Sequence, residues 1–310
     1  MRKVIGIGET TLDIIFKNEQ PVGAVPGGSV FNALISLGRA GADACFISEV
    51  GNDRIGKNVI NFLRDNHVDS QSVVCAAEAK SSVSLAFLNE NNEAEYLFYK
   101  SQPQASTQWF FPEINEDDIL IIGSFYAVNP TIRTQMSDLL TYARQQGAII
   151  YYDVNFRSSH SHEVMKITPN LLENYEWAYI VRGSRDDFEV LYKKTDADRI
   201  YKSDIAFYCK NFIYTRGADS IKVFGAGGWQ KDYSVPTIPT VSTIGAGDNF
   251  NAGFIYGLIK EGITRNHLET GMSEAQWDSI IHYAQLFAAE CCKDIYNYVS
   301  EEWARELKNS

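Results

Sequence analysis

The stretch TIGAGDNFNAG, residues 243–253, places two glycines and an alanine directly before an aspartate and a helical pattern. The first N–H groups of a helix lack partners within the helix and lie at the positive end of its dipole. Small residues at this point, Gly245, Ala246 and Gly247, would let an anion approach the backbone closely. Asp248 would repel a resting anion. It is therefore either a helix cap or a base that deprotonates a hydroxyl while the N–H groups hold a transferring phosphoryl group.

Around this stretch, short apolar runs alternate with helical patterns along the chain. The runs that end in turn residues are predicted strands, at 3–8, 44–51, 118–124, 148–154, 177–183 and 211–217. Helical patterns lie at 29–41, 55–66, 130–146, 198–209, 248–260 and 274–293. This alternation predicts an α/β fold with a mainly parallel sheet covered by helices on both faces. Ligands of such sheets bind beyond the carboxyl ends of the strands.

Residues 81–100, SSVSLAFLNENNEAEYLFYK, break this alternation with two strand patterns joined by a polar turn. They predict an antiparallel hairpin, which is either a lid and candidate homodimer surface or an edge hairpin of the main sheet. Because no linker or repeat divides the chain, the sequence predicts one domain over residues 1–310 with a small β appendage.

Composition excludes several classes of partner. The formal net charge of −11 argues against nucleic acid and anionic membranes. No apolar run approaches the roughly 20 residues that span a bilayer, and Glu9 and Asp13 interrupt the apolar N-terminal stretch. The five cysteines lack metal-type spacing and predict buried free thiols in a cytoplasmic protein.

The common nucleotide-binding motifs are absent from the sequence. There is no G-x-x-x-x-G-K-[ST], which excludes a P-loop enzyme. GIGETT at 6–11 stops short of G-x-G-x-x-G, so an NAD-dependent oxidoreductase is a weak alternative.

Two longer stretches, PGGSVFNALISLGRAGADACFISEVGNDRIG at 26–56 and STIGAGDNFNAGF at 242–254, resemble the signature regions of the ribokinase-like, or PfkB, family of carbohydrate kinases. Their order and the α/β rhythm between them extend the resemblance along essentially the whole chain. It implies a doubly wound, mainly parallel sheet flanked by helices, with lid strands from about 14–25 and 82–101. It also implies transfer of the ATP γ-phosphoryl group to a sugar or nucleoside hydroxyl with Mg²⁺.

The resemblance assigns roles to Asp248, to the turn before it and to Asp13. Asp248 corresponds to the catalytic base, and the backbone of Gly245, Ala246 and Gly247 to an anion hole. Asp13, expected at the end of the first strand, would bridge vicinal sugar hydroxyls, with a turn-forming aspartate as the alternative.

Three further residues near the first signature are expected to contact the sugar. Gly27 and Gly28 would admit the sugar to the backbone, and Asn32 would supply an amide. Without the resemblance, the helical spacing of Asn32, Ser36 and Arg39 would indicate a solvated stripe.

YLFYK, residues 96–100, resembles the lid stretch FYR of the fructokinase and 2-keto-3-deoxygluconate kinase branch. Phe98 or Tyr99 would cover a sugar face while Lys100 binds a polar substituent. An ordinary hairpin with an exposed lysine is the alternative. Since lysine lacks the planar fork of arginine, this residue favours a neutral hexose over a sugar acid.

DVNFR, residues 153–157, resembles the D-x-N-x-R stretch of the same branch. Arg157 would neutralise charge on the phosphoryl group, and Asp153 or Asn155 would position water or Mg²⁺. The alternative is a structural pair at a strand end.

TRG, residues 215–217, resembles a nucleotide loop, with Thr215, Arg216 and Gly217 near the nucleotide. A plain turn is the alternative.

The sequence departs from the family at three points. Ser184-Arg185-Asp186-Asp187 stands where many members have N-x-x-E near the phosphates. We therefore place Ser184 near the nucleotide and expect Asp187 to reach Mg²⁺ through water. Ser242 replaces the usual aspartate, and CCKDIYNYV at 291–299 lacks a glycine-containing loop, so we do not expect a required K⁺.

The sequence as a whole predicts an ATP-dependent sugar kinase of the fructokinase type that phosphorylates a primary hydroxyl. A 2-keto-3-deoxygluconate kinase, a ribokinase and a nucleoside kinase stay open as alternatives. A sensor that binds sugar or nucleotide without catalysis is the alternative from another functional class.

Overall fold

The computed structural model describes residues 2–89, 94–99 and 108–309. The chain forms two compact units. Unit 1 comprises Met1–Pro112, Ile238–Gly257 and Ile280–Ser310, and unit 2 comprises Glu113–Thr237 and Leu258–Ser279. Whether the chain acts as one domain stays a prediction.

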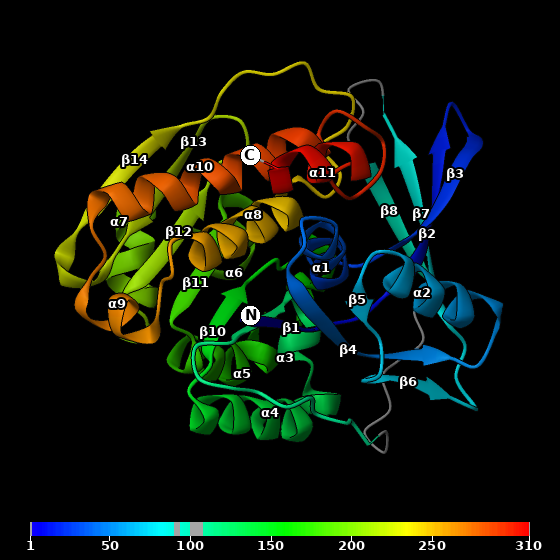
Figure 1. Ribbon diagram of the computed structural model, residues 1–310, viewed down its shortest axis with the longest axis horizontal. Coiled ribbons are helices and arrows are strands. Elements are labelled where there is room, and N and C mark those ends of the chain that lie inside the picture. The colour runs from blue at the N-terminus through cyan, green and yellow to red at the C-terminus, as the bar shows by residue number, and fades with distance from the viewer. Residues whose placement is uncertain (1, 90–93, 100–107, 310) are drawn as a thin grey trace. The chain divides into compact units, whose positions relative to one another are not determined.

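Unit 1 contains parallel strands in the order β1-β4-β5, with β6 also paired to β4. Their bounds are β1 (Lys3–Ile7), β4 (Asp43–Gly51), β5 (Val68–Asp69) and β6 (Val73–Ala76). Helices α1 (Ser29–Arg39) and α2 (Arg54–Asp65) both contact β4 (Figure 1). A Cβ on Gly6 would lie 2.6 Å from the Leu34 side chain, so a glycine in β1 lets α1 pack closely. Helix α11 (Glu301–Asn309) follows the C-terminal segment and contacts α1.

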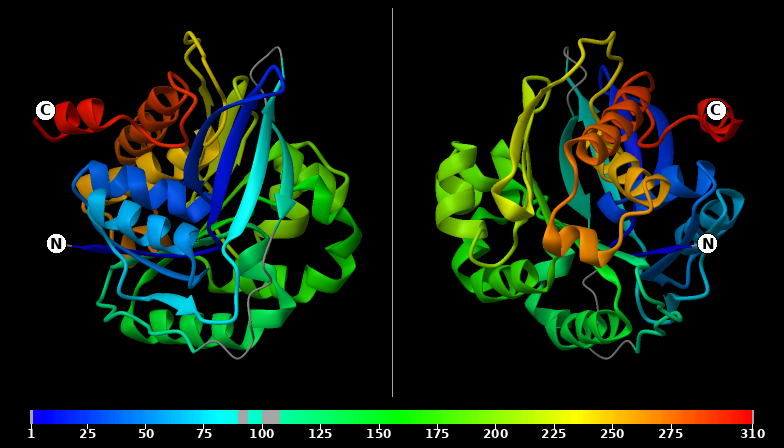
Figure 2. Two further views of the ribbon diagram at one scale, coloured as in Figure 1. Left: turned by 90° about the vertical axis from the view of Figure 1, so that its right-hand side faces the viewer. Right: turned by 60° about the vertical axis from the view of Figure 1, so that its left-hand side comes forward.

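A second sheet in unit 1 has the strand order β3-β2-β7-β8. Its strands are β2 (Thr11–Lys17), β3 (Gln20–Gly27), β7 (Ser82–Leu88) and β8 (Ala94–Tyr99), which lie side by side in Figure 2. β2 and β7 pair in parallel, whereas the outer pairs β2–β3 and β7–β8 are antiparallel. The predicted hairpin is therefore confirmed, and the alternative of an edge hairpin on the main sheet is wrong.

Unit 2 contains six strands in the order β9-β10-β11-β12-β13-β14. They are β9 (Ile119–Gly123), β10 (Ile149–Asp153), β11 (Ile180–Ser184), β12 (Asn211–Thr215), β13 (Ser220–Phe224) and β14 (Gln230–Ser234). The first four are parallel, and β13 and β14 are antiparallel. Every residue of β9, β10 and β12 is buried, as expected for strands covered on both faces.

Helices alternate with these strands, which confirms the α/β fold class. They are α3 (Ser124–Val128), α4 (Arg133–Gln146), α5 (Val164–Trp177), α6 (Arg185–Tyr192), α7 (Ala197–Ile200) and α9 (Arg265–Thr270). Helices α4 and α5 contact each other and β10 (Figure 1). The chain crosses between the two units within α8 (Ala246–Lys260) and α10 (Glu274–Cys291).

Three sequence expectations need correction or extension here. Asp13 does not end the first strand, because β1 stops at Ile7 and Asp13 lies inside β2. The five cysteines are free, but Cys75 is exposed while the other four are buried. Within residues 2–89, 94–99 and 108–309, every helix is too short or too polar to span a bilayer.

Candidate functional site

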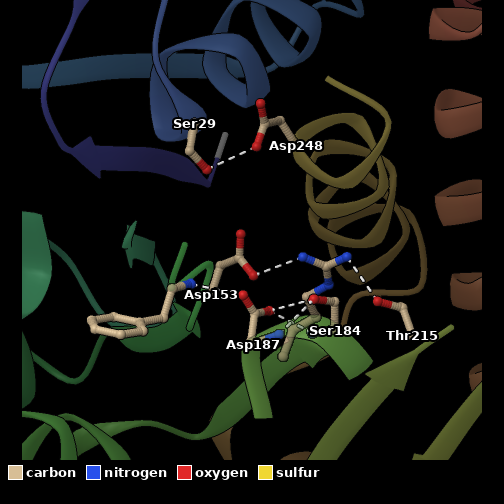
Figure 3. Close-up of polar contacts among 8 residues, drawn as sticks. Ser29, Asp153, Ser184, Asp187, Thr215 and Asp248 are labelled. Atoms are coloured by element: carbon tan, nitrogen blue, oxygen red, sulfur yellow. Dashed lines mark hydrogen bonds and ion pairs between the residues drawn. The ribbon is translucent and has the colours of Figure 1, made fainter. Parts of the chain in front are cut away.

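The opening of α8 places Asp248 beside the first turn of α1 in unit 1. Ser29 Oγ donates to Asp248 Oδ1 at 2.8 Å (Figure 3). Asn32 Nδ2 donates to Asp248 Oδ2, also at 2.8 Å. Asp248 is the third residue of α8, and Gly245 O accepts the first helical hydrogen bond, from Asn249 N at 2.9 Å. The N-cap position is therefore Gly245, and the carboxylate is held by another helix.

The backbone before α8 fits only glycine at its tightest point. Gly245 has φ +73°, and a Cβ there would lie 2.8 Å from Asn297 O. Asn249 Nδ2 donates to Gly245 O at 2.9 Å, and Ser36 Oγ donates to Asn249 Oδ1 at 2.5 Å. Ala246 N donates to Thr243 O at 3.2 Å, so an anion at this turn would have to share or replace that bond.

Asp13 is buried on the inner face of the second sheet of unit 1, where it is 5% exposed. Its Oδ1 accepts from Thr11 Oγ1 and Ser84 Oγ, each at 2.5 Å, and its Oδ2 accepts from Asn297 Nδ2 at 3.1 Å. Three donors on two oxygens match an ionised carboxylate, which only accepts hydrogen bonds. A Cβ on Gly27 would lie 2.1 Å from Asp13 Oδ2, so this position requires glycine.

The start of α1 carries the other two residues predicted to contact a sugar. Gly28 is the N-cap with φ +137°, and a Cβ there would lie 2.4 Å from Glu9 O. Asn32 is 5% exposed, and its Oδ1 is buried without a hydrogen-bond partner among the described residues. The solvated stripe considered from helical spacing is wrong, because Ser36 is also fully buried.

The register of the second sheet separates Tyr99 from Asp13. Asp13 pairs with Ser84, which pairs with Phe98. Because side chains alternate along a strand, Phe98 shares the face of Asp13 and Tyr99 lies on the opposite face, 62% exposed. Lys100 lies outside the described residues.

Arg182, in the middle of β11, joins the ends of two neighbouring strands in unit 2. Its Nη1 donates to Asp153 Oδ1 and its Nη2 to Thr215 Oγ1, each at 2.9 Å (Figure 3). All three side chains are buried, and Asp153 and Thr215 are the last residues of β10 and β12. Burial alone would lower the pKa of Arg182, but the Asp153 carboxylate raises it above its ordinary value.

Asp187 closes a capping box at the start of α6. Its Oδ1 accepts from Phe156 N at 2.7 Å, and its Oδ2 accepts from Ser184 N at 2.6 Å and Ser184 Oγ at 2.8 Å. Burial raises the pKa of Asp187 to about 6, against the opposing attraction of Arg182. Since chain donors already occupy both oxygens, the carboxylate fits a metal ion held through water better than one bound directly.

The remaining predicted residues of unit 2 lie in the loops after the strands. Asn155 is half-buried with φ +35°, and Arg157 is exposed at the N-cap of the 3₁₀ turn Ser158–Glu163. Arg216 is exposed and donates through Nε to Ser220 Oγ at 2.8 Å. Gly217 has φ +55° with open space around it. No group of three or more His, Cys, Asp or Glu residues in the described part of the chain could hold a metal ion.

The pfkB family of carbohydrate kinases matches residues 1–300. The chain belongs to this family. It is therefore a phosphotransferase that acts on a sugar hydroxyl, which confirms the predicted enzyme class and excludes the NAD-dependent alternative.

Characterised relatives of this pfkB kinase differ in substrate. The 5-dehydro-2-deoxygluconokinase of Geobacillus thermodenitrificans is 27% identical over 263 residues, covering 80% of this chain and 77% of its own. Fructokinase-1 of Zea mays is 26% identical over 250 residues, covering 76% and 74%. The crystal structure of a Vibrio cholerae fructokinase with fructose, ADP and calcium ion has a TM-score of 0.84 at 20% identity over 99% of each chain. At that identity the structure shows the fold alone, and the ribokinase-like fold class is confirmed.

Sequence reasoning missed three residues of this pfkB kinase that hydrogen-bond to predicted site residues, namely Ser29, Arg182 and Asn297. Ser29 directly follows the two glycines of the first signature, where a hydroxyl next to a helix start was a usable signal. Arg182 is a charged residue inside the apolar run 177–183, which also marks it as special. Asn297 lies in a C-terminal segment whose local pattern carries no such signal.

Proposed function

We propose that this kinase transfers the γ-phosphoryl group of ATP to a primary hydroxyl of fructose. The observation that carries the proposal is the Asp248 carboxylate, held by Ser29 and Asn32 and directly preceded by the glycine-rich turn. A base beside a helix N-terminus combines proton removal with a place for phosphoryl oxygens. Fructokinases among the relatives support fructose as the acceptor.

In the proposed step, Asp248 takes the proton of the acceptor hydroxyl as that oxygen attacks the γ-phosphorus. The bond between the γ-phosphorus and the β,γ-bridging oxygen breaks, and ADP leaves with that electron pair. Ser29 and Asn32 fix the direction of the carboxylate, and the backbone of Gly245, Ala246 and Gly247 holds the phosphoryl oxygens. Positioning and charge stabilisation supply most of the rate in such reactions.

Asp13 is the proposed sugar-binding group of unit 1. Three chain donors leave about one of the roughly four acceptor sites of the Asp13 carboxylate, so one sugar hydroxyl can bind directly and a second binds by displacing Thr11 or Ser84. Gly27 and Gly28 let Asp13 and the Glu9 carbonyl come close to the backbone before α1, and Asn32 offers its carbonyl oxygen. Because Phe98 shares the face of Asp13, we assign the proposed cover of the sugar to Phe98 in place of Tyr99.

Nucleotide binding is proposed for the strand ends of unit 2. Ser184 and the loop of Thr215, Arg216 and Gly217 would hold the nucleotide, and Arg157 would neutralise phosphate charge. Asp153 and Asn155 would order water near the phosphates, and Asp187 would hold Mg²⁺ through water. When bound, Mg²⁺ would neutralise charge on the phosphates.

A homodimer through the second sheet of unit 1 is also proposed. The face of this sheet opposite Asp13 is mostly apolar and half-exposed across three strands, with side chains Leu12, Ile14, Phe16, Val83, Leu85, Phe87, Leu97 and Tyr99, and with the exposed Glu95 in β8. We call it the outer lid face. Monomers rarely leave so continuous an apolar face uncovered, and a second copy of the same face would bury it symmetrically.

A sugar acid is the second candidate acceptor, because relatives named 5-dehydro-2-deoxygluconokinase match this chain as well as the fructokinases do. The deciding experiment is ADP release with Mg·ATP across fructose, glucose, ribose, 5-dehydro-2-deoxygluconate, 2-keto-3-deoxygluconate and adenosine. A kcat/KM for fructose at least tenfold above every other compound supports the proposal. A sugar acid in first place overturns fructose but leaves the kinase in place.

A further inference from the structure

The C-terminal segment between α10 and α11 brings one buried amide to two parts of the proposed site. Asn297 is 2% exposed and donates through Nδ2 to Asp13 Oδ2 at 3.1 Å. Its main-chain oxygen accepts from Asn249 Nδ2 at 2.8 Å, and the same Asn249 nitrogen donates to Gly245 O. One residue therefore contacts the proposed sugar carboxylate and is tied to the turn before α8.

The packing around Asn297 leaves no room for either glycine to change. A Cβ on Gly27 would lie 3.1 Å from Asn297 Nδ2, and a Cβ on Gly245 would lie 2.8 Å from Asn297 O. Gly27 belongs to the first signature region and Gly245 to the second, so Asn297 lies close to the backbone of both regions.

Asn297 also contains an orphan polar atom. Its Oδ1 is buried without a hydrogen-bond partner among the described residues. Turning the amide over would satisfy no more groups, because it would aim Oδ1 at the Asp13 carboxylate, which cannot donate. A buried polar atom without a hydrogen bond costs stability, and it persists in proteins where the rest of the site determines the position of the side chain.

We propose that Asn297 is a positioning residue that orients Asp13 through its side chain and the Gly245 turn through its main chain. It transfers no proton and acts through the two groups it holds. This inference rests on the proposed function of Asp13 and of the turn before α8. We call the hydrogen bond from Asn297 to Asp13 the side-chain arm. The hydrogen bonds from Asn249 to Asn297 and to Gly245 form the main-chain arm.

The two arms can be cut separately. Asn297→Ala removes the side-chain arm, and Asn297→Leu removes it while keeping the volume in case the alanine variant folds poorly. We expect either variant to raise the KM for the acceptor sugar at least ~10-fold, since a hydrogen bond to a charged group is lost. The KM for ATP should stay within twofold. Asn249→Ala cuts the main-chain arm and should lower kcat at least ~10-fold with a smaller change in sugar KM.

Asn174→Ala is the matched control, because Asn174 is an equally buried amide in unit 2 that donates to Ala127 O. Its loss should lower the thermal midpoint but leave the sugar KM unchanged. Calorimetric binding of sugar to each variant supplies a readout that does not need turnover.

The outcomes separate this inference from the function on which it rests. A wild-type chain that phosphorylates no sugar in the panel overturns the proposed function and this inference together. An active wild type whose Asn297→Ala and Asn297→Leu variants keep the sugar KM within twofold overturns this inference alone. A sugar KM that rises equally in Asn174→Ala would show a general loss of stability and would also overturn it.

Discussion

At the scale of single residues, Asp248 is the side chain on which the proposed chemistry depends. Both of its oxygens accept hydrogen bonds from α1, so an amide in its place would keep the shape but not the basicity. We expect Asp248→Asn to lower kcat at least ~100-fold while nucleotide binding stays measurable by calorimetry. Ser29→Ala keeps the base and should lower kcat less than Asp248→Asn does. An Asp248→Asn variant with normal turnover would remove the assigned base.

Asp187 gives a residue-scale prediction that needs no substrate. Burial raises its pKa from 3.8 to about 6, so the folded chain keeps this proton to a higher pH than the unfolded chain. The free energy of unfolding should therefore fall as the pH rises through that window. Compared with Asp187→Asn, the wild type should lose roughly 1–3 kcal/mol between pH 4 and pH 7.

Urea denaturation of both proteins at the two pH values, with a chelator present, measures that difference. Asp186→Asn is the control, because Asp186 is the exposed neighbouring carboxylate. Its unfolding free energy should follow the wild type at both pH values. A wild type that gains stability relative to Asp187→Asn on going to pH 7 would contradict the assigned burial.

At the scale of elements, the outer lid face predicts the oligomeric state. Leu97 and Tyr99 in β8 are 48% and 62% exposed, and Phe16 stacks on Phe87 beside them at 4.8 Å between ring centroids. Leu97→Glu would place a charge in the β8 part of the proposed interface and should convert dimers to monomers in sedimentation velocity. Phe207→Glu is the control, because Phe207 is 88% exposed in unit 2 and should leave the mass unchanged. A wild type that is monomeric at micromolar concentration would contradict the proposed dimer.

Elements with a clear hydrophobic pattern were predictable from the sequence, and elements without one were not. The runs that became β9, β10 and β12 are fully buried and apolar except at their ends, so their type and place followed directly. Helix α5 contains Pro169 inside it, a residue that normally argues against a helix interior, and it was not predicted. Strand β14, QKDYS, has no buried residue and pairs only at an edge, so its sequence carried no hydrophobic signal.

The candidate site was predictable where one segment carried the chemistry. Local spacing pointed to Asp248 and the turn before it, because the glycines and the carboxylate adjoin in sequence, but it left a helix cap open, and the resemblance to the family supplied the role of base. The partners of Asp13 could not be found in this way, since Ser84 and Asn297 are 71 and 284 residues away along the chain. Only the pairing of β2 with β7, and the return of the C-terminal segment, bring them to one carboxylate.

At the scale of the whole molecule, the two compact units divide the proposed ligands between them. Sugar contacts, around Asp13 and 26–32, lie in unit 1, whereas the proposed nucleotide contacts at 184–187 and 215–217 lie in unit 2. The turn before α8 also belongs to unit 1. The division predicts that each ligand protects its own set of backbone amides from hydrogen exchange.

Exchange measured by mass spectrometry tests this division. At 100 times its Kd, a ligand stabilises the bound state by about 2.7 kcal/mol, which slows exchange through openings that release it by about 100-fold. Fructose should protect 26–32 but not 215–217, and a nucleotide should protect 184–187 and 215–217. In Asp13→Asn, fructose should no longer protect 26–32, whereas a nucleotide should still protect 184–187 and 215–217. Protection of 215–217 by fructose alone would contradict the assignment of the nucleotide to unit 2, because a sugar held by Asp13 and the residues at the start of α1 makes no proposed contact there.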